Sequence, residues 1–343
     1  MCTFQFCIEA SFRQAILLLS IKQSWASTNF ASPLSISLER PNMSNSFKTI
    51  TGCSGQLGQL AVDHLLEQSH HALRATTRTP EKLLHLRDIG IDVRLADFDQ
   101  PATLQTAFEG TQRLLLISTD QTNIGKKRIS QHRNAIAAAE MAGVKHIIYT
   151  SLLKADNSPL GMVAKDHAET ESFLKDSRMG FSILRNAFYM EMLLWILPGA
   201  IASGELVSAA GDGRIAYISR NDCAHAAACA LLANDTGHHC LDITGREALG
   251  FEDIVAITNK TFGTNIIFKP ISRLALIQHM TNRGVSREFA GVLAHIDNAI
   301  SQDAMNVVSD DFEGLTGRQP IGIDTFLLEH YDVIMKDAKK LLR

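Results

Sequence analysis

From residue 47 onward, short apolar runs alternate regularly with longer segments of helical period, and this alternation constrains the fold more than any other feature. The apolar runs predict strands at 47–51, 73–77, 92–95, 113–118, 146–150 and 181–185. The segments between them predict helices at 57–68, 80–88, 102–108, 128–142 and 165–177. Repeated strand-helix-strand order requires parallel strands joined by right-handed crossovers. We therefore predict an α/β fold with a doubly wound parallel sheet, whose ligands bind at the carboxyl ends of the strands.

After residue 188 the regular alternation of predicted strands and helices ends. A long apolar helix is predicted at 188–203, and "GDGRIAYISRNDCAHAAACALL" predicts a strand that leads into a helix at 221–233. The remaining segments indicate a smaller, α-rich C-terminal lobe; they are 240–243, 251–263, 265–269, 272–282, 286–302 and 323–341. We expect the sheet domain to occupy 43–188, with 205–246 partly returning to it, and the smaller lobe to occupy 189–343.

Residues 1–42 are expected to form an N-terminal extension outside the fold, because "MSNSFKTI" at 43 leads directly into the first strand. This extension is a translation-start artefact, a weak targeting segment or an added helix, and the sequence leaves the three alternatives open.

Composition excludes several classes of protein. The 343 residues carry a net charge of −3 without a clustered basic face, so nucleic acid is not an expected partner. The longest apolar runs are shorter than the roughly 20 residues that span a bilayer, so no membrane partner is expected. The six scattered cysteines favour a cytoplasmic, reducing setting. "HH" at 70–71 and "HHC" at 238–240 lack ligand spacing, so no metal site is expected.

The glycine-rich stretch "TGCSGQLG" at 51–58 stands between the first predicted strand and its helix. A glycine turn at this point brings backbone N–H groups and a helix N-terminus to an anion such as a pyrophosphate. The alternative is a glycine-rich turn without a ligand. The cofactor-binding residues predicted here are Gly52, Cys53, Ser54, Gly55, Gln56, Leu57 and Gly58. The Cys53 thiol either has a pKa lowered by the helix N-terminus or simply occupies a small-residue position.

The end of the second predicted strand indicates which dinucleotide is bound. Arg78 stands 20 residues after Gly58, where an NAD site usually has an acidic residue for the ribose hydroxyl. A guanidinium there favours a 2′-phosphate, with Lys82 as a second cation. We therefore predict NADP as cofactor, with NADPH preferred and NADH still usable. The alternative for Arg78 is a solvated surface arginine.

Two further strand ends supply candidate cofactor contacts. Asp97 can accept a hydrogen bond from the adenine amino group, and the Phe98 ring can stack nearby. An ordinary turn with a buried phenylalanine is the alternative. Ser118 and Thr119, which end the strand "RLLLIST", are expected beside the ribose and the phosphates.

These stretches together resemble the NmrA-like, atypical short-chain dehydrogenase/reductase family. The pieces that carry the resemblance, in order, are "TGCSGQLG", "TRTPEK", "ADFDQP", "LLLIST", "QHRNAIAAAEMAGVKHIIYTSLLKAD", "SPLG", "HAETE" and "LRNAFYMEM". The chain is most similar to the bacterial NAD(P)H:quinone oxidoreductase (type 2) branch, with triphenylmethane dye reductases as near relatives. The resemblance runs from about residue 46 to the C-terminus. It implies a Rossmann-type domain, bound NADP(H) and two-electron reduction of a flat electrophile held under the C-terminal lobe.

The proton donor of orthodox short-chain dehydrogenases is missing. Their Tyr-x-x-x-Lys pair corresponds to Val163 and His167 in "GMVAKDHAETESFL". Without a strong acid, the expected acceptor is a quinone, whose delocalised product anion water can protonate. His167 either donates a proton or binds the nicotinamide ribose, or it is a surface histidine in contact with Glu171.

The nicotinamide is expected near the ends of the fifth and sixth strands. Cofactor contacts are predicted from Thr150, Asn186, Ala187 and Phe188, and catalytic roles from Ser151, His167 and Tyr189. The rings of Phe188 and Tyr189 would stack on an aromatic acceptor, or else they belong to the core, where Trp195 is also expected.

The leading hypothesis is an NADPH:quinone oxidoreductase acting on a small aromatic acceptor. An NADP-binding redox sensor without turnover is the first alternative, because the missing Tyr-Lys pair suits it equally. A reductase of aromatic dyes is the second. A homodimer is compatible with the sequence.

Overall fold

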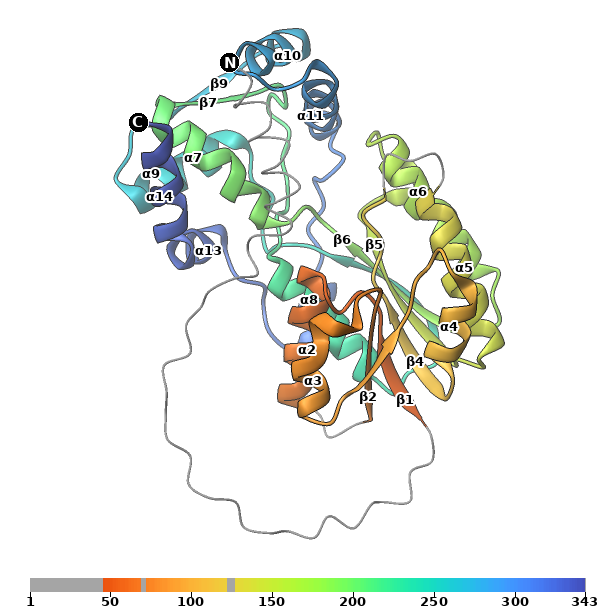
Figure 1. Cartoon of the computed structure of the whole chain (residues 1–343). Coiled ribbons are helices and arrows are strands. Elements are labelled where there is room, and N and C mark those ends of the chain that lie inside the picture. Colours follow the sequence, from red (N-terminus) through yellow and green to blue (C-terminus); the bar gives the residue numbers. More distant parts are fainter. Residues whose placement is uncertain (1–45, 69–71, 122–126, 343) are drawn as a thin grey trace, which may run out of the picture.

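The computed structural model describes residues 46–68, 72–121 and 127–342. The predicted extension over 1–42 and the pair His70 and His71 lie outside these residues. Seven parallel strands form one sheet in the order β3-β2-β1-β4-β5-β6-β8 (Figure 1). The strands are β1 (Phe47–Ile50), β2 (Leu73–Thr77), β3 (Asp92–Leu95), β4 (Thr111–Leu116), β5 (His146–Leu152), β6 (Gly180–Asn186) and β8 (His238–Ile243). The strand order reverses between β1 and β4, which is where doubly wound sheets open a ligand crevice.

Helices cover both faces of the sheet (Figure 1). On one face lie α2 (Gln56–Gln68), the 3-10 turn η1 (Pro80–Leu83) with α3 (Leu84–Asp88), and α8 (Arg220–Leu232). On the other face lie α4 (Pro101–Phe108), α5 (Lys127–Met141) and α6 (Met162–Lys175). This arrangement confirms the expected doubly wound parallel sheet, since the helices after β1 and after β4 pack on opposite faces.

The apolar strands supply both faces of the core. In β4, Leu115 belongs to the cluster under α2 and α8, whereas Leu114 and Leu116 belong to the cluster under α4 and α5, and all three are fully buried. Successive strand side chains point to opposite faces, so a strand covered on both sides needs an unbroken apolar run. This is why "RLLLI" forms a central strand.

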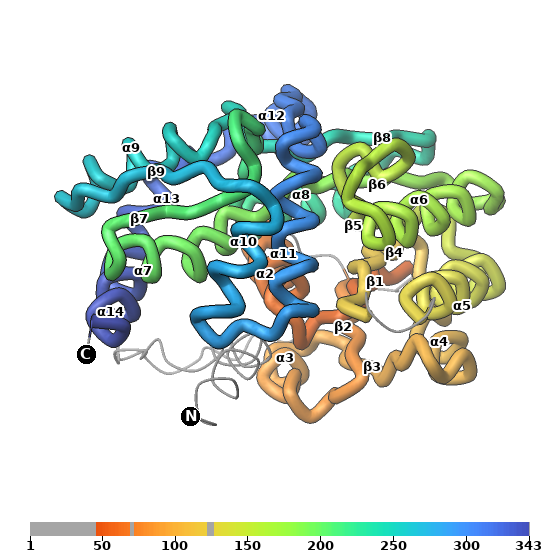
Figure 2. Tube along the Cα trace, turned by 90° about the horizontal axis from the view of Figure 1, so that it is seen from above, coloured from red at the N-terminus to blue at the C-terminus, as the bar shows by residue number. Residues whose placement is uncertain are grey.

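The smaller lobe lies beyond the carboxyl ends of the strands (Figure 1), and seen from above it extends to one side of the sheet (Figure 2). Its two-stranded parallel sheet pairs β7 (Glu205–Ser208) with β9 (Ile267–Pro270). Its helices are α7 (Leu193–Ser203), α9 (Phe251–Phe262), α10 (Arg273–Asn282), α11 (Arg287–Ile300), α13 (Ile323–Glu329) and α14 (Tyr331–Leu341), with short 3-10 turns η2 (Ala155–Asn157) and η3 (Met190–Met192) elsewhere. A further helix, α12 (Asp311–Thr316), packs on α8 and β8. No helix within the described ranges combines the length and the apolar character needed to cross a bilayer.

Four expectations about the second half of the chain are corrected. Residues 215–218 form only isolated bridges, because their backbone groups pair with Leu249, Met305 and Phe188 from separate segments. The helix expected over 188–203 begins as the turn η3. The helix expected over 323–341 divides at His330 into α13 and α14. Trp195 is 42% exposed, because α7 turns Leu193 and Leu197 toward the core instead.

Candidate active site

The turn between β1 and α2 has the geometry of a phosphate cradle. Gly52 has a φ of +65°, which favours glycine, and its carbonyl accepts a hydrogen bond of 2.9 Å from the N–H of Gly55. A Cβ on Gly58 would clash with the Gly52 carbonyl and lie 2.8 Å from the Cα of Cys53. The helix therefore starts in close contact with the strand, and the residues of its first turn line the space beyond the glycine turn.

A cavity of about 430 Å³ opens over this turn, at the point where the strand order reverses. The structure brings most of the predicted cofactor residues together in its lining. These residues are Gly52, Ser54, Gly55, Gln56, Leu57, Gly58, Arg78, Phe98, Ser118 and Thr119. Residues from four strand ends thus meet around one space large enough for part of a dinucleotide.

Seven predicted cofactor residues lie outside this lining, and three of them, Cys53, Lys82 and Asp97, come from the segments that follow β1, β2 and β3. Cys53 is fully buried, its thiol donates to the carbonyl of Ile50, and burial raises the pKa of that thiol to about 12, so it occupies a small-residue position in the core. Lys82 is exposed on η1. The carboxylate of Asp97 accepts hydrogen bonds from the N–H of Asp99 (3.0 Å) and from Nε2 of Gln100 (2.8 Å), so it serves the turn before α4.

Several lining residues escaped the sequence analysis. Thr77 precedes Arg78, and its hydroxyl is 2.7 Å from that of Ser54, which ties the end of β2 to the glycine turn. Gln131 reaches the cavity from α5. It belongs to "QHRN", one of the more specific pieces of the family resemblance, and that signal was available from the sequence. The other additions are Gln59, Ala96, Ile117, Asp120 and Gln121.

The carboxyl end of β5 is tied to the cavity wall. The N–H of Ser118 donates to Oγ1 of the buried Thr150 over 2.9 Å, which connects the loop after β4 to β5. The next residue, Ser151, donates its hydroxyl proton to Glu171 on α6 over 2.7 Å. Glu171 also holds Arg185 on β6 through two hydrogen bonds of 2.9 and 2.6 Å. Ser151 therefore has a carboxylate partner and is not among the cavity-lining residues.

His167 lies inside the protein and not on the surface of α6. It is 5% exposed, with Nδ1 2.8 Å from the hydroxyl of Tyr149 and Nε2 3.2 Å from the guanidinium of Arg128. Because Arg128 only donates, Nε2 accepts and the ring proton sits on Nδ1. Burial and the charge of Arg128 hold the pKa of His167 well below its usual value. The alternative of a surface contact with Glu171 is wrong.

The residues after β6 form a second polar group. Nδ2 of Asn186 donates to the hydroxyl of Tyr189 over 3.1 Å, and the buried Oδ1 of Asn186 accepts no hydrogen bond from the described residues. Burial raises the pKa of Tyr189, so its phenol keeps its proton at neutral pH. Ala187 is buried and its N–H donates to the carbonyl of Ile243, while Phe188 is half-buried against the core. None of these residues lines the 430 Å³ cavity.

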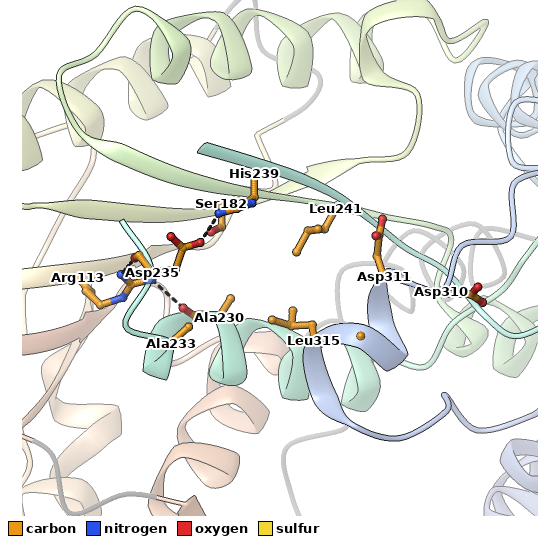
Figure 3. A pocket seen from close by; sticks show the side chains of 11 residues that line it. Arg113, Ser182, Ala230, Ala233, Asp235, His239, Leu241, Asp310, Asp311 and Leu315 are labelled. Atoms are coloured by element: carbon orange, nitrogen blue, oxygen red, sulfur yellow. Dashed lines mark hydrogen bonds and ion pairs between the residues drawn. The ribbon is translucent and has the colours of Figure 1, made fainter. Parts of the chain in front are cut away.

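Figure 3 shows a second cavity, of about 420 Å³, toward the amino ends of β4, β6 and β8. Four of its five charged or titratable side chains have partners. Arg113 donates to the carbonyls of Ala230 (2.9 Å) and Leu231 (3.1 Å), His239 pairs with Asp235, and Asp311 accepts from the N–H of Asp242 over 2.8 Å. Parallel sheets bind ligands at the opposite end, so this cavity is not the nucleotide site. Among the described residues, no group of three or more His, Cys, Asp or Glu side chains is placed to hold a metal ion.

Comparison with known proteins identifies the family. Residues 52–234, more than half of the chain, match the family model described as NAD(P)H-binding. The chain belongs to this NAD(P)H-binding family. Quinone oxidoreductase 2 of Escherichia coli (strain K12) is 37% identical over 259 residues, which cover 75% of this chain and 88% of that relative.

Two solved structures extend the likeness to the fold. An NADPH-dependent quinone oxidoreductase from Escherichia coli, complexed with NADPH, superimposes with a TM-score of 0.77 at 34% identity, covering 82% of this chain and 99% of that one. The triphenylmethane reductase of Citrobacter sp., complexed with NADP(H), does so with a TM-score of 0.74 at 32% identity, covering 85% and 99%.

These findings confirm the resemblance to the NmrA-like family and to its quinone oxidoreductase branch, the Rossmann-type fold, and an NAD(P)H-dependent oxidoreductase. Independently of these relatives, two features of the cavity fit a bound dinucleotide. The cavity meets a glycine turn that a Cβ at position 58 would obstruct, and the buried oxygens of Thr119 (Oγ1) and Gln131 (Oε1) beside it lack partners among the described residues.

Proposed function

We propose that this protein transfers a hydride from NADPH to a quinone or a closely similar flat aromatic acceptor. The observation that carries the proposal is the 430 Å³ cavity at the reversal of strand order, whose lining includes both the glycine turn and Arg78. The likeness to quinone oxidoreductases over most of the chain supports the choice of acceptor.

The chain's own residues would hold the cofactor in three places. The backbone of the glycine turn over 54–57 and the N-terminus of α2 would bind the pyrophosphate. Arg78, exposed at the end of β2, would pair with a 2′-phosphate and so favour NADPH over NADH. Ser118 and Thr119 would line the path of the nicotinamide half.

NADPH supplies the hydride, so the protein needs only to orient the acceptor and to exclude competing reactions. The position of the orthodox tyrosine holds Val163, and His167 is enclosed by Tyr149 and Arg128, so neither residue offers a proton to a substrate. This arrangement suits an acceptor whose reduced form is a weakly basic phenolate that water protonates.

Phe188 and Tyr189 are proposed to contact the acceptor from the end of β6. The Tyr189 oxygen accepts a hydrogen bond from Asn186, and its own proton has no acceptor among the described residues. A protonated phenol in this state can donate to a quinone oxygen and so polarise the ring toward hydride addition. Replacing Tyr189 by Phe would remove that donor and keep the ring.

The proposal is tested by steady-state oxidation of NADPH, and then NADH, by the full chain with benzoquinone, a naphthoquinone and crystal violet. We expect turnover with a quinone and a preference for NADPH. Turnover with crystal violet alone would favour a dye reductase. Tight NADPH binding without turnover on any acceptor would favour the redox sensor. The absence of the Tyr-Lys pair from this chain is equally compatible with that function.

We further propose the division into a nucleotide-binding domain over 43–188, with 205–246 partly joining it, and a substrate lobe over 189–343. The pairing of β8 with β6 and the packing of α8 on α2 support this division. A cytoplasmic setting is proposed because the described cysteines, Cys53, Cys223, Cys229 and Cys240, are free thiols. Sedimentation of the purified chain would report whether it forms a homodimer.

A further inference from the structure

The loop between β5 and α6 touches the smaller lobe at two points outside the nucleotide cavity. Nζ of Lys154 donates a hydrogen bond of 2.8 Å to the carbonyl of Asp303, in the turn after α11. A Cβ on Gly161 would lie 3.2 Å from Nε2 and 3.9 Å from Cε1 of His295 on α11. The outer edge of the His295 ring therefore lies against the start of α6. Figure 1 shows α11 and this end of α6 facing each other beyond the carboxyl ends of the strands.

The backbone at these contacts adopts conformations that most side chains disfavour. Among the described residues, Lys154 (φ 53°) and Asp303 (φ 58°) are the non-glycine residues with positive φ. Gly161 has a φ of 67°, so glycine suits both this conformation and the close approach of His295. Strained residues persist only where their surroundings hold them, and they gather at functional sites. The contact between the loop and the lobe is therefore held in one geometry.

The same loop borders the proposed acceptor site. It follows β5 directly, and the N–H of Leu153 donates to the carbonyl of Asn186, at the end of β6, over 3.0 Å. The side chain of Asn186 donates in turn to the hydroxyl of Tyr189, which is proposed to contact the acceptor. The loop that meets His295 thus begins beside the residues that would hold the acceptor.

A second segment joins the end of β6 to the turn after α11. The N–H of Ile218 donates to the carbonyl of Phe188 over 3.0 Å, and the N–H of Ala216 donates to the carbonyl of Met305 over 3.1 Å. The C-terminal end of α11 is therefore tied to the acceptor side of the sheet by this segment and by Lys154. His295 belongs to the last two turns of the helix that is held in this way.

Apolar side chains are exposed on both helices that meet at His295. Met162 is 64% exposed and Val163 is 36% exposed at the start of α6. Val292, one turn before His295 on α11, is 46% exposed. Exposed apolar side chains on two adjoining elements favour an aromatic ligand over a charged one. The acceptor would therefore approach the end of β6 past these side chains and past the His295 ring.

We infer that His295 limits the thickness of the acceptor that the protein reduces. Its ring edge lies over the start of α6, so a flat quinone passes, whereas a triarylmethane dye, whose three rings are twisted out of one plane, does not. Lys154 is a positioning residue, because it acts by holding Asp303 and with it the end of α11. This inference rests on the proposed quinone reduction and makes flat, uncharged quinones the preferred substrate class.

The test compares kcat/KM for a naphthoquinone and for crystal violet, with NADPH as the donor. We expect the unmodified protein to prefer the naphthoquinone by about a hundredfold or more. His295→Ala removes the ring and should lower this preference by about tenfold or more, through faster reduction of crystal violet. His295→Phe keeps a ring of similar thickness and should keep the preference. The dissociation constant of NADPH should be the same in all these proteins, because His295 does not line the nucleotide cavity.

His279→Ala is the matched control. His279 is a half-buried histidine of α10 in the same lobe, and its charged neighbours include Glu205 and Lys269 of the small sheet. Its replacement should leave the preference between the two acceptors unchanged. Lys154→Met should lower the preference by about two- to tenfold, and Lys154→Arg should restore it, since a guanidinium can donate to the same carbonyl.

Three outcomes overturn the inference while reduction of the quinone leaves the proposed function standing. They are efficient reduction of crystal violet by the unmodified protein, an unchanged preference in His295→Ala, and an equal fall in preference in His279→Ala. If His295→Ala does not fold, as judged by circular dichroism, His295→Ser takes its place with the same expected result. Absence of turnover with both acceptors, although NADPH binds, overturns the proposed function together with the inference.

Discussion

The backbone N–H of Thr119 donates a hydrogen bond to Nε2 of the fully buried His132 over 3.0 Å. Since Nε2 accepts, the ring proton lies on Nδ1, which donates to Oγ1 of Thr170 over 2.9 Å; that hydroxyl donates in turn to the carbonyl of Asp166. Burial and the charge of Arg128 lower the pKa of His132 to about 3, so the ring stays neutral. A neutral histidine therefore holds one wall of the nucleotide cavity.

Replacing His132 by Leu should raise the dissociation constant of NADPH by about three- to tenfold, because the N–H of Thr119 loses its acceptor and the wall loosens. Fluorescence titration with NADPH measures the effect. His146→Leu is the control: His146 is also buried and 2.9 Å from Ser182, but it lies away from the cavity. We expect both variants to lose stability and only His132→Leu to lose affinity for NADPH. Equal NADPH affinities of the two variants would contradict this prediction.

Acid should unfold the protein through its buried histidines. Burial lowers the pKa of His132 to about 3 and of His146 to about 4, and that of His167 also lies well below normal. Between these values and about 6.5, the unfolded chain binds protons that the folded chain does not, so stability falls as the pH drops. Each histidine contributes at most about 1.4 kcal/mol per pH unit. Urea unfolding between neutral pH and pH 5 measures the slope; a flat profile would contradict the burial of these rings.

Arg78→Ala should raise the KM for NADPH by about ten- to a hundredfold and leave the KM for NADH nearly unchanged, because only NADPH carries the 2′-phosphate. Lys82→Ala is the matched control: this nearby cation is exposed on η1 and absent from the cavity lining, so less than about a twofold change is expected. Equal effects of Arg78→Ala on the two cofactors would remove the assignment of the 2′-phosphate.

Alanine at two positions of the glycine turn should have different consequences. At Gly58 the new Cβ meets the backbone of Gly52 and Cys53, so unfolding free energy should fall by about 1–3 kcal/mol and NADPH binding should be lost with it. At Gly55 the nearest atom is the Gly52 carbonyl oxygen at 3.2 Å, so the protein should remain folded and lose mainly affinity. Thermal unfolding and NADPH titration of both variants separate the two outcomes.

Glu171→Gln should destabilise the fold by about 1–3 kcal/mol, because it removes the buried carboxylate that holds Arg185 and leaves its guanidinium paired only with the exposed Asp156. Glu171 is 1% exposed and Arg185 15%, so solvent replaces little of the lost interaction. Glu169→Gln, on the same helix but half-buried, should change stability by less than about 0.5 kcal/mol. Urea unfolding tests the pair, and similar values for the two variants would argue against the Glu171 network.

The regular part of the fold follows from local pattern. The apolar run at 113–118 forms β4 and the run at 146–150 forms β5, which extends two residues further to Leu152. The sheet buries side chains on both faces of these two strands. The glycine turn and Arg78 were equally readable, since backbone conformation and charge at one strand end decide their placement.

Side chains that depend on partners from distant segments were not predictable. His167 is buried because Arg128 arrives from α5 and Tyr149 from β5, and no spacing within α6 reveals either contact. Asp97 follows β3, as expected for a contact with adenine, but its carboxylate accepts hydrogen bonds from Asp99 and Gln100 of the same turn. The bridges at 215–218 involve three separate segments, which a strand-like pattern alone cannot show.

The edge strand β8 pairs with β6, although the whole of α7, β7 and α8 lies between them in the chain. During synthesis the nucleotide-binding sheet is therefore still incomplete when residue 188 leaves the ribosome. The edge of β6 stays unpaired until about fifty more residues have been made. The nucleotide-binding sheet and the α7–β7 segment of the smaller lobe would then fold together. A mutation that slows the folding of the α7–β7 segment should lower the yield of NADPH-binding protein, even though it touches no residue of the nucleotide cavity.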